Sequence, residues 1–250
     1  MPKKNFKYYP IILTIIVAIQ MMCFFLSKRQ IQFFNLSVNG SGLLFPLDIY
    51  LFEIIGYCYG YEYSRQAVWV NMVAHIGFFI IIFVVNLLPY ANGMHQNYID
   101  AYNTIFKFSY WMIIGSILGE FVGDFFSAII VPKSKLKFQG RYSSFIIFFV
   151  HLISSFLVVS IAYIITNLPD GYTMLEIFKL IIGTMVIKTL IAIIMFPIAK
   201  KLINFIKISE GVDIYDNNQT YSFFRFNPDL KKIKYVAFEG KYNVKKNNIN

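Results

Sequence analysis

The chain has 250 residues, of which 57% are hydrophobic and only 14% are charged. Soluble domains carry charge on about a quarter of their residues, so this composition excludes an ordinary soluble protein and indicates a polytopic membrane protein. The formal net charge of +10 does not indicate nucleic acid binding. Its lysines and arginines gather beside the apolar stretches and in the C-terminal tail, where a membrane orientation signal explains them better.

Six apolar stretches are each long enough to cross a bilayer as a helix, which needs roughly 20 residues. They cover residues 8–27, 43–61, 67–88, 109–131, 144–167 and 175–199. Because they lack the alternation of barrel strands, the predicted fold class is all-α, with six transmembrane helices. The first stretch has no small-residue cleavage site, so we expect a retained span and not a signal peptide.

The basic residues predict which loops face the cytoplasm. They cluster before the first stretch, between the second and third, between the fourth and fifth, and after the sixth. The opposite loops carry only Lys28, Arg29, Lys107 and Lys179. Because basic loops stay inside, both termini are predicted to be cytoplasmic. The abundance of Asn, Lys and Ile is typical of an AT-rich bacterial source, which places the protein in the inner membrane.

Two segments lie outside the predicted spans. The loop of residues 89–108 is the longest between spans and is expected outside. After Ile206 the composition shifts to Asn, Lys, Tyr and Asp, so we expect a six-helix transmembrane domain over 1–206 and a polar, basic cytoplasmic tail over 207–250, with little local structure. Its run Lys231-Lys232-Ile233-Lys234 is more typical of a patch facing solvent or lipid headgroups than of a specific binding site.

Glu53 is the strongest functional candidate, because it is a carboxylate inside the second apolar stretch. Leaving a full charge at bilayer depth costs roughly 3 kcal/mol or more. Tyr50, Glu53, Tyr57 and Gly60 recur at three- and four-residue spacing, which places them on one helix face. The carboxylate can accept two parallel hydrogen bonds from a guanine-like edge, or carry a proton, and tyrosine rings can stack on a base. The structural alternative is an ion pair with Lys188.

The fourth stretch combines small and acidic residues. A small residue stands at every fourth position, namely Gly115, Gly119, Gly123 and Ser127. This glycine seam predicts close packing against another helix. Offset by one residue, Ser116, Glu120 and Asp124 form a polar stripe that we expect to face the bundle interior.

Polar residues interrupt three further stretches. Asn71 and His75 form a pair in the third, and His151 and Ser154 share one face of the fifth. A lone His is more often a hydrogen-bonded interior residue than a ligand. Lys188 lies roughly 18 Å from the basic end of the sixth stretch, too deep to snorkel easily. It therefore needs a carboxylate partner or must lose its proton.

Motifs typical of catalysis are missing from the sequence. There is no GxxxxGK[ST] phosphate loop and no HExxH zinc motif, and Asn39-Gly40-Ser41-Gly42 lacks the leading glycine of a serine-nucleophile motif. Cys23 and Cys58 lie in apolar stretches without metal-ligand spacing. We therefore expect no enzymatic activity, no bound metal and no cofactor.

Together these residues resemble the queuosine precursor transporter family, also called vitamin uptake transporters. Members are small six-helix bacterial membrane proteins that import 7-deazaguanine bases. Phe45-Pro46, Glu53, Tyr59-Gly60 and Arg65 match the family's second-span signature in order. In the sixth stretch Lys188 and Pro197 stand at the family's separation, and the resemblance covers most of residues 40 to 200.

The chain departs from the family pattern at several polar positions. Glu53 stands where the family usually has Asp, and Tyr57 occupies its second acidic position. In the fourth stretch Gly123 and Asp124 replace the usual Asn-Ser. In the fifth, the family's Gln-x-x-Asp-Thr corresponds to residues 151–155, so an expected aspartate is absent. These departures leave the fold inference standing and weaken the inference about substrate.

The resemblance implies an importer of a small planar base, working as a secondary transporter or facilitator, with no nucleic acid partner. Glu53 would contact the donor edge of the base, Tyr50 and Tyr57 would frame it, and Lys188 would balance charge or contact its carbonyl. The other predicted substrate-binding residues are Glu120, His151 and Ser154, and the coupling or gating candidates are Asp124, Arg65 and Asn71. A homo-oligomer or an energising partner is compatible with this function.

Three alternatives stay open. In the first, the cargo is another planar vitamin-like heterocycle. In the second, the chain is a non-transporting membrane subunit that packs through its glycine seam. In the third, it is a membrane enzyme acting on lipid or prenyl groups. The subunit hypothesis predicts that Lys188 locks Glu53 and that the bundle has no central cavity. The enzyme hypothesis needs clustered metal or nucleophile residues, which the sequence lacks.

Overall fold

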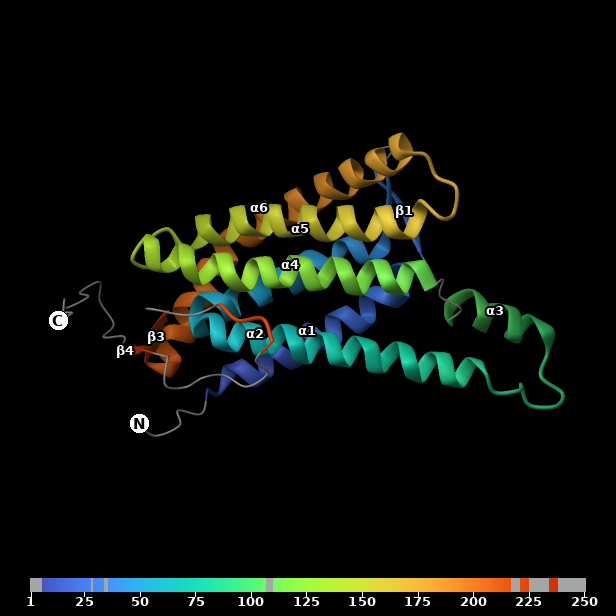
Figure 1. The fold of residues 1–250 in the computed structure, drawn as a ribbon, viewed down its shortest axis with the longest axis horizontal. Coiled ribbons are helices and arrows are strands. Elements are labelled where there is room, and N and C mark those ends of the chain that lie inside the picture. The colour runs from blue at the N-terminus through green and yellow to red at the C-terminus, as the bar shows by residue number, and fades with distance from the viewer. Residues whose placement is uncertain are drawn as a thin grey trace.

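Helices dominate the computed structural model, which describes residues 6–27, 29–33, 36–106, 110–216, 221–224 and 234–237. Five candidate membrane-spanning helices make up the bundle in Figure 1. They are α1 (Tyr8–Ser27), α2 (Phe45–Asn86), α4 (Tyr110–Lys137), α5 (Ser143–Asn167) and α6 (Met174–Glu210). The prediction of an all-α polytopic membrane protein is confirmed.

The helix α2 breaks sharply at Gly60. It is 42 residues long, about twice the length of one bilayer crossing. Gly60 has φ 77° and ψ −177°, a conformation that glycine adopts without steric cost because it has no Cβ. The two halves of α2 therefore correspond to the predicted second and third stretches, which the helix joins without a loop.

Contacts along α1 show that α2 reverses its direction at this break. In order along α1 they are Tyr9 with both Tyr59 and Tyr63, Gln20 with Asp48, and Phe24 with Phe79. As the residue number along α1 increases, the number of the partner residue decreases in the first half of α2 and increases in the second half. The first half is thus antiparallel to α1 and the second half is parallel to it, as Figure 1 shows.

The start of α1 and the end of α6 lie at the same end of the bundle. The backbone N–H of Tyr8 donates a hydrogen bond to Glu210 Oε1 at 2.8 Å. The turn at Gly60 belongs to this end too, because the Tyr59 hydroxyl donates to the same Glu210 oxygen at 3.0 Å. We call it the turn end of the bundle.

Shorter elements lie outside the long helices. The expected outer loop contains a helix, α3 (Gln96–Phe106). Two antiparallel strand pairs join β1 (Gln30–Phe33) to β2 (Leu36–Asn39) and β3 (Val212–Tyr215) to β4 (Lys234–Ala237), and a short 3-10 helix, η1 (Gly40–Leu43), precedes α2. Several basic residues of the orientation argument lie outside the described residues: Lys3, Lys4, Lys28, Lys107 and the run 231–233.

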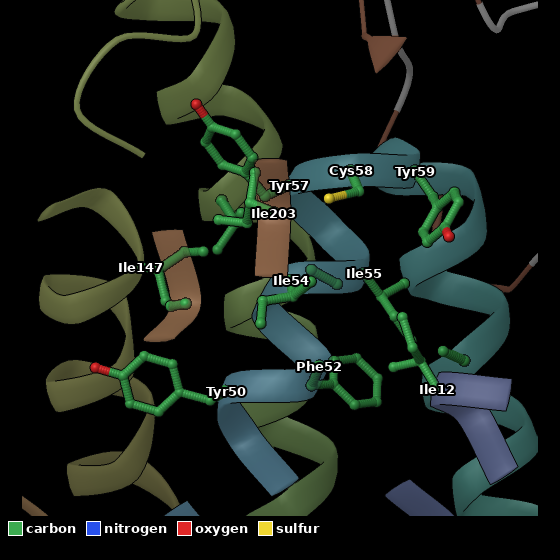
Figure 2. Packing of buried hydrophobic residues seen from close by; sticks show 14 of the residues in the cluster. Ile12, Tyr50, Phe52, Ile54, Ile55, Tyr57, Cys58, Tyr59, Ile147 and Ile203 are labelled. Atoms are coloured by element: carbon green, nitrogen blue, oxygen red, sulfur yellow. The ribbon is translucent and has the colours of Figure 1, made fainter. Parts of the chain in front are cut away.

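The first half of α2 forms the core of the bundle. Its side chains are buried on almost every side from Ile49 to Tyr59, as expected for a helix that is apolar all round. Figure 2 shows Phe52 and Ile55 facing Ile12 of α1, while Tyr50 extends toward the helix that carries Ile147. Polar groups on this half of α2 are therefore held far from water.

The glycine seam of α4 packs against α5. A Cβ atom built on Gly119 would lie 2.8 Å from the carbonyl oxygen of Val158, and one on Gly115 would lie 2.9 Å from that of Ala162. Both distances are shorter than a normal contact, so the helices approach as closely as glycine allows. The predicted close packing is confirmed, and it occurs within the chain, which removes the seam as a surface for a larger complex.

This packing predicts that Gly119→Val destabilises the bundle. The added side chain must push α4 away from α5, and overpacking of this kind costs about 1–3 kcal/mol. Thermal unfolding in detergent measures the effect. Gly77→Ala is the matched control, because a Cβ atom there meets nothing within 4 Å. Equal melting temperatures for the two variants would contradict the proposed role of the seam.

Candidate functional site

Glu53 lies in the buried half of α2 and faces α5. Its carboxylate accepts a hydrogen bond from Ser154 Oγ at 3.3 Å, and His151 Nδ1 lies 3.6 Å from its other oxygen. The Tyr50 ring stacks on the His151 imidazole with 4.3 Å between centroids. The Tyr50 hydroxyl donates to the Ala192 carbonyl of α6 at 2.9 Å. We call Tyr50, Glu53, His151 and Ser154 the Glu53 site.

The Glu53 site has spare hydrogen-bonding capacity. Within the described part of the chain, Glu53 Oε2 and both ring nitrogens of His151 have no hydrogen-bond partner. Each of these residues is at most 1% exposed. Buried polar atoms are nearly always paired, and an unpaired one costs roughly 1–3 kcal/mol. These atoms are therefore available to a ligand or to a proton.

Lys188 does not bind Glu53. Its ammonium lies 4.1 Å from the centroid of the Phe45 ring, and no ion pair among the described residues includes it. The acidic side chains within electrostatic range of it are Cys23, Glu120 and Asp48. The predicted carboxylate partner is thus replaced by a cation–π contact and two carboxylates that are not in contact. The alternative in which Lys188 locks Glu53 is wrong.

A second polar cluster joins the later half of α2 to α4. His75 Nδ1 lies 2.6 Å from Glu120 Oε2. Asn71 and Asp124 line the same small cavity of about 10 Å³ as His75 and Glu120. We call these four residues the His75–Glu120 site. The structure therefore brings together two groups that the sequence placed only on separate stretches.

Sequence reasoning missed Asp48 and Gln20. Gln20 Nε2 of α1 donates to Asp48 Oδ2 at 2.7 Å, and both side chains are almost fully buried. Their remaining oxygens have no hydrogen-bond partner in the described ranges. An acidic residue in the first turn of a helix is common and favourable, so the position of Asp48 looked ordinary. Only the close approach of α1 identifies it as an interior charge.

Tyr57 and Arg65 lie away from the Glu53 site, at the turn end. The Tyr57 hydroxyl donates to the Gly140 carbonyl at 2.8 Å. Arg65 forms an ion pair with Glu62 at 2.5 Å and donates to the Ser222 carbonyl at 3.0 Å. Tyr57 shares a helix face with Glu53, but one further turn of the helix carries it out of reach of that site. Its predicted framing role gains no support from its position.

Residues after α6 fasten the turn end. Asp213 binds Lys135 of α4 at 2.5 Å and Lys207 of α6 at 2.8 Å. Asp216 Oδ2 accepts a hydrogen bond from the backbone N–H of Tyr61 at 2.7 Å, directly after the break in α2. We call residues 212–216 and 221–224 the strap. It ties α2, α4 and α6 together at the end where α1 begins.

Asp213 keeps its negative charge although it is buried. Burial opposes the charge, but the ammonium groups of Lys135 and Lys207 outweigh this effect and hold the pKa of the Asp213 carboxyl below its ordinary value. The ion pairs are therefore intact at neutral pH. Loss of this carboxylate would leave two buried ammonium groups without their partner.

Comparison with protein families gives one match. The family model of the vitamin uptake transporters matches residues 39–201, which include α2, α4, α5 and most of α6. No curated protein and no solved structure matches the chain. The matched region contains the Glu53 site and the His75–Glu120 site, and it ends before the strap.

The Asp213 ion pairs predict a specific pH dependence of stability. Because the pKa is lower in the folded state, Asp213 stabilises the fold fully above its unfolded-state pKa of about 3.9, and this contribution disappears as the pH falls through the folded-state value. Asp213→Asn should cost about 3–5 kcal/mol at pH 7. It should also lower the melting temperature in detergent less at pH 3 than at pH 7.

Asp170→Asn is the control for this experiment, because Asp170 is exposed in the loop between α5 and α6. It should leave the melting temperature unchanged at both pH values. A variant Asp213→Asn as stable as the parent at pH 7 would show that the strap does not hold the helices.

Proposed function

The chain belongs to the vitamin uptake transporter family, and on this basis we propose that it imports a queuosine precursor, a 7-deazaguanine-type base. It is a multi-pass membrane transporter. We further propose six membrane crossings, two of them in α2, with both termini in the cytoplasm of a bacterium. The hydrogen bond between Tyr8 and Glu210 supports placing the start of α1 and the end of α6 on the same side of the membrane. The basic loops support the cytoplasmic side.

The spare capacity of the Glu53 site is the observation that carries this proposal. A carboxylate accepts two parallel hydrogen bonds from adjacent donors, and a guanine-type edge offers a ring N–H beside an amino group. Among the described residues, Glu53 presents one oxygen without a hydrogen-bond partner and another that accepts from Ser154. The stacked rings of Tyr50 and His151 stand beside it, and flat rings favour a planar heterocycle.

Base binding requires the helices to move. The cavity beside Glu120 and Asp124 has a volume of about 10 Å³, whereas small-molecule sites span roughly 300–1,000 Å³. We propose that this conformation is occluded, with the strap closing the cytoplasmic end. Transport then alternates between conformations that open the Glu53 site to one side of the membrane at a time.

The rival functions now have less support. The subunit hypothesis predicted that Lys188 locks Glu53 and that the bundle has no central cavity. Lys188 lies on Phe45 instead of Glu53, and the glycine seam packs within the chain, whereas the core cavity of about 10 Å³ fits the second prediction. Within the described part of the chain no group of three metal-ligating side chains exists, so the enzyme hypothesis gains no metal centre. Another planar heterocycle remains the closest alternative, because the same stack and carboxylate suit it.

Uptake complementation tests the proposal. The chain is expressed in a bacterium that can neither make nor import queuosine precursors, single bases are supplied at low concentration, and queuosine is measured in tRNA. We expect a 7-deazaguanine base to restore queuosine. If the transporter is present in the membrane but none of the supplied precursors restores queuosine, the result would contradict the proposal and favour a different heterocycle.

In the same assay, Glu53→Gln should reduce uptake at least tenfold. The amide keeps the shape of the side chain but presents only one acceptor oxygen, and hydrogen bonds to charged groups contribute about 1.5–3 kcal/mol. Membrane level and melting temperature should stay near those of the parent. Asp100→Asn on the exposed helix α3 is the control, and full uptake by Glu53→Gln would remove Glu53 from the site.

A further inference from the structure

The sequence predicted Glu120 as a substrate-binding residue, but the structure pairs it with His75 and not with the Glu53 site. The base contacts proposed above therefore do not use the His75–Glu120 site. It joins two elements that belong to different parts of the bundle, the later half of α2 and α4. We propose that this site binds the proton whose inward movement drives import of the base. This inference rests on the proposed transport function and adds the coupling ion and its residues.

The geometry of the pair suits a proton carrier. His75 Nδ1 and Glu120 Oε2 are 2.6 Å apart, within ion-pair distance, and Glu120 Oε2 has no hydrogen-bond partner among the described residues. Both residues are at least nine-tenths buried. Intramembrane carboxylate and histidine chains serve as proton relays in pumps and transporters.

Two unpartnered groups point to a further occupant of the same site. Asn71 Oδ1 and His75 Nε2 are buried and lack a hydrogen-bond partner in the described residues. Both residues line the cavity with Glu120 and Asp124. Its volume of about 10 Å³ is at the lower limit for one water, and a polar cavity of that size suits one. A single water there would connect the imidazole to Asp124.

The carboxylates around the site oppose one another's charge. Four carboxylates act on one another across the core, those of Asp48, Glu53, Glu120 and Asp124. Lys188 of α6 supplies one ammonium group against them. Three residues of α1 lie on this side of the cluster. Gln20 donates a hydrogen bond to Asp48, Cys23 follows it along the helix, and the Phe24 and His75 ring centroids are 4.9 Å apart. Like charges in a dry interior resist joint ionisation, so a proton on one of these carboxylates eases the charge on the others.

In this arrangement, proton binding and base binding favour each other, as import driven by an inward proton movement requires. Asp124 lies within electrostatic range of Glu53. A proton that reaches Asp124 of the His75–Glu120 site removes negative charge near Glu53 and so favours its ionised form, which binds the base. By reciprocity, base bound to ionised Glu53 strengthens proton binding at the His75–Glu120 site. One proton enters from outside together with each base. It is then released to the cytoplasm.

Transport in proteoliposomes separates coupling from transport itself. The purified full chain is reconstituted, and radiolabelled 7-deazaguanine is followed in two modes. Counterflow at equal pH measures exchange, and accumulation under an inward proton gradient measures coupling. The parent should show both, and a protonophore should abolish accumulation. Counterflow without any effect of the gradient would overturn the coupling inference alone, whereas absence of counterflow would overturn the proposed function as well.

Variants locate the coupling site. Glu120→Gln and His75→Gln should retain counterflow within about threefold of the parent but lose accumulation above the outside concentration. Glu120→Asp keeps the titrating group and should restore part of the accumulation. Asp100→Asn is the control and should behave as the parent. Accumulation by Glu120→Gln and His75→Gln equal to the parent would overturn the assignment, as would loss of counterflow in folded His75→Gln.

Discussion

The cost of holding charge away from water governs this bundle. The first half of α2 lies at its centre, and it carries Asp48 toward α1 and Glu53 toward α5. A buried charge without compensation costs several kcal/mol, so each helix around α2 supplies a polar group to this core. In the part of the chain that the structure describes, the same shortage of partners leaves Glu53 Oε2 and His75 Nε2 without a hydrogen bond. We regard those atoms as the working parts of a transporter.

Hydropathy was sufficient to predict the long helices, because a bilayer requires apolar runs of a nearly fixed length. The glycine seam also predicted correctly that α4 packs closely against a neighbour. The stretches predicted over 43–61 and 67–88 implied a reversal between them. Its form, a break at Gly60 without a loop, was not predicted, since only the backbone conformation distinguishes such a break from a loop. The interior partners were predicted less well. Lys188 contacts Phe45 instead of a carboxylate. Spacing along one helix does not show which neighbour a side chain faces, so this contact could not be predicted.

The strap adds a feature that the family match does not include. Asp213 connects α4 to α6, and Asp216 caps the chain where α2 turns. The matched region ends at residue 201, so these contacts lie outside it. The strap lies at the turn end of the bundle, which we propose faces the cytoplasm, and it suits a closure of that side. Release of the base on that side would then require these ion pairs to separate or to move as a unit.

Binding of base analogues to the purified protein tests the role of Glu53 most directly. The decisive comparison is 7-deazaguanine against the analogue that lacks only the 2-amino group, measured by equilibrium competition. If Glu53 accepts two parallel hydrogen bonds, loss of one donor leaves a buried carboxylate oxygen unpaired and should weaken binding at least tenfold, about 1.4 kcal/mol. Glu53→Gln should reduce that difference. Equal affinity for the two bases would contradict recognition of the donor edge by Glu53.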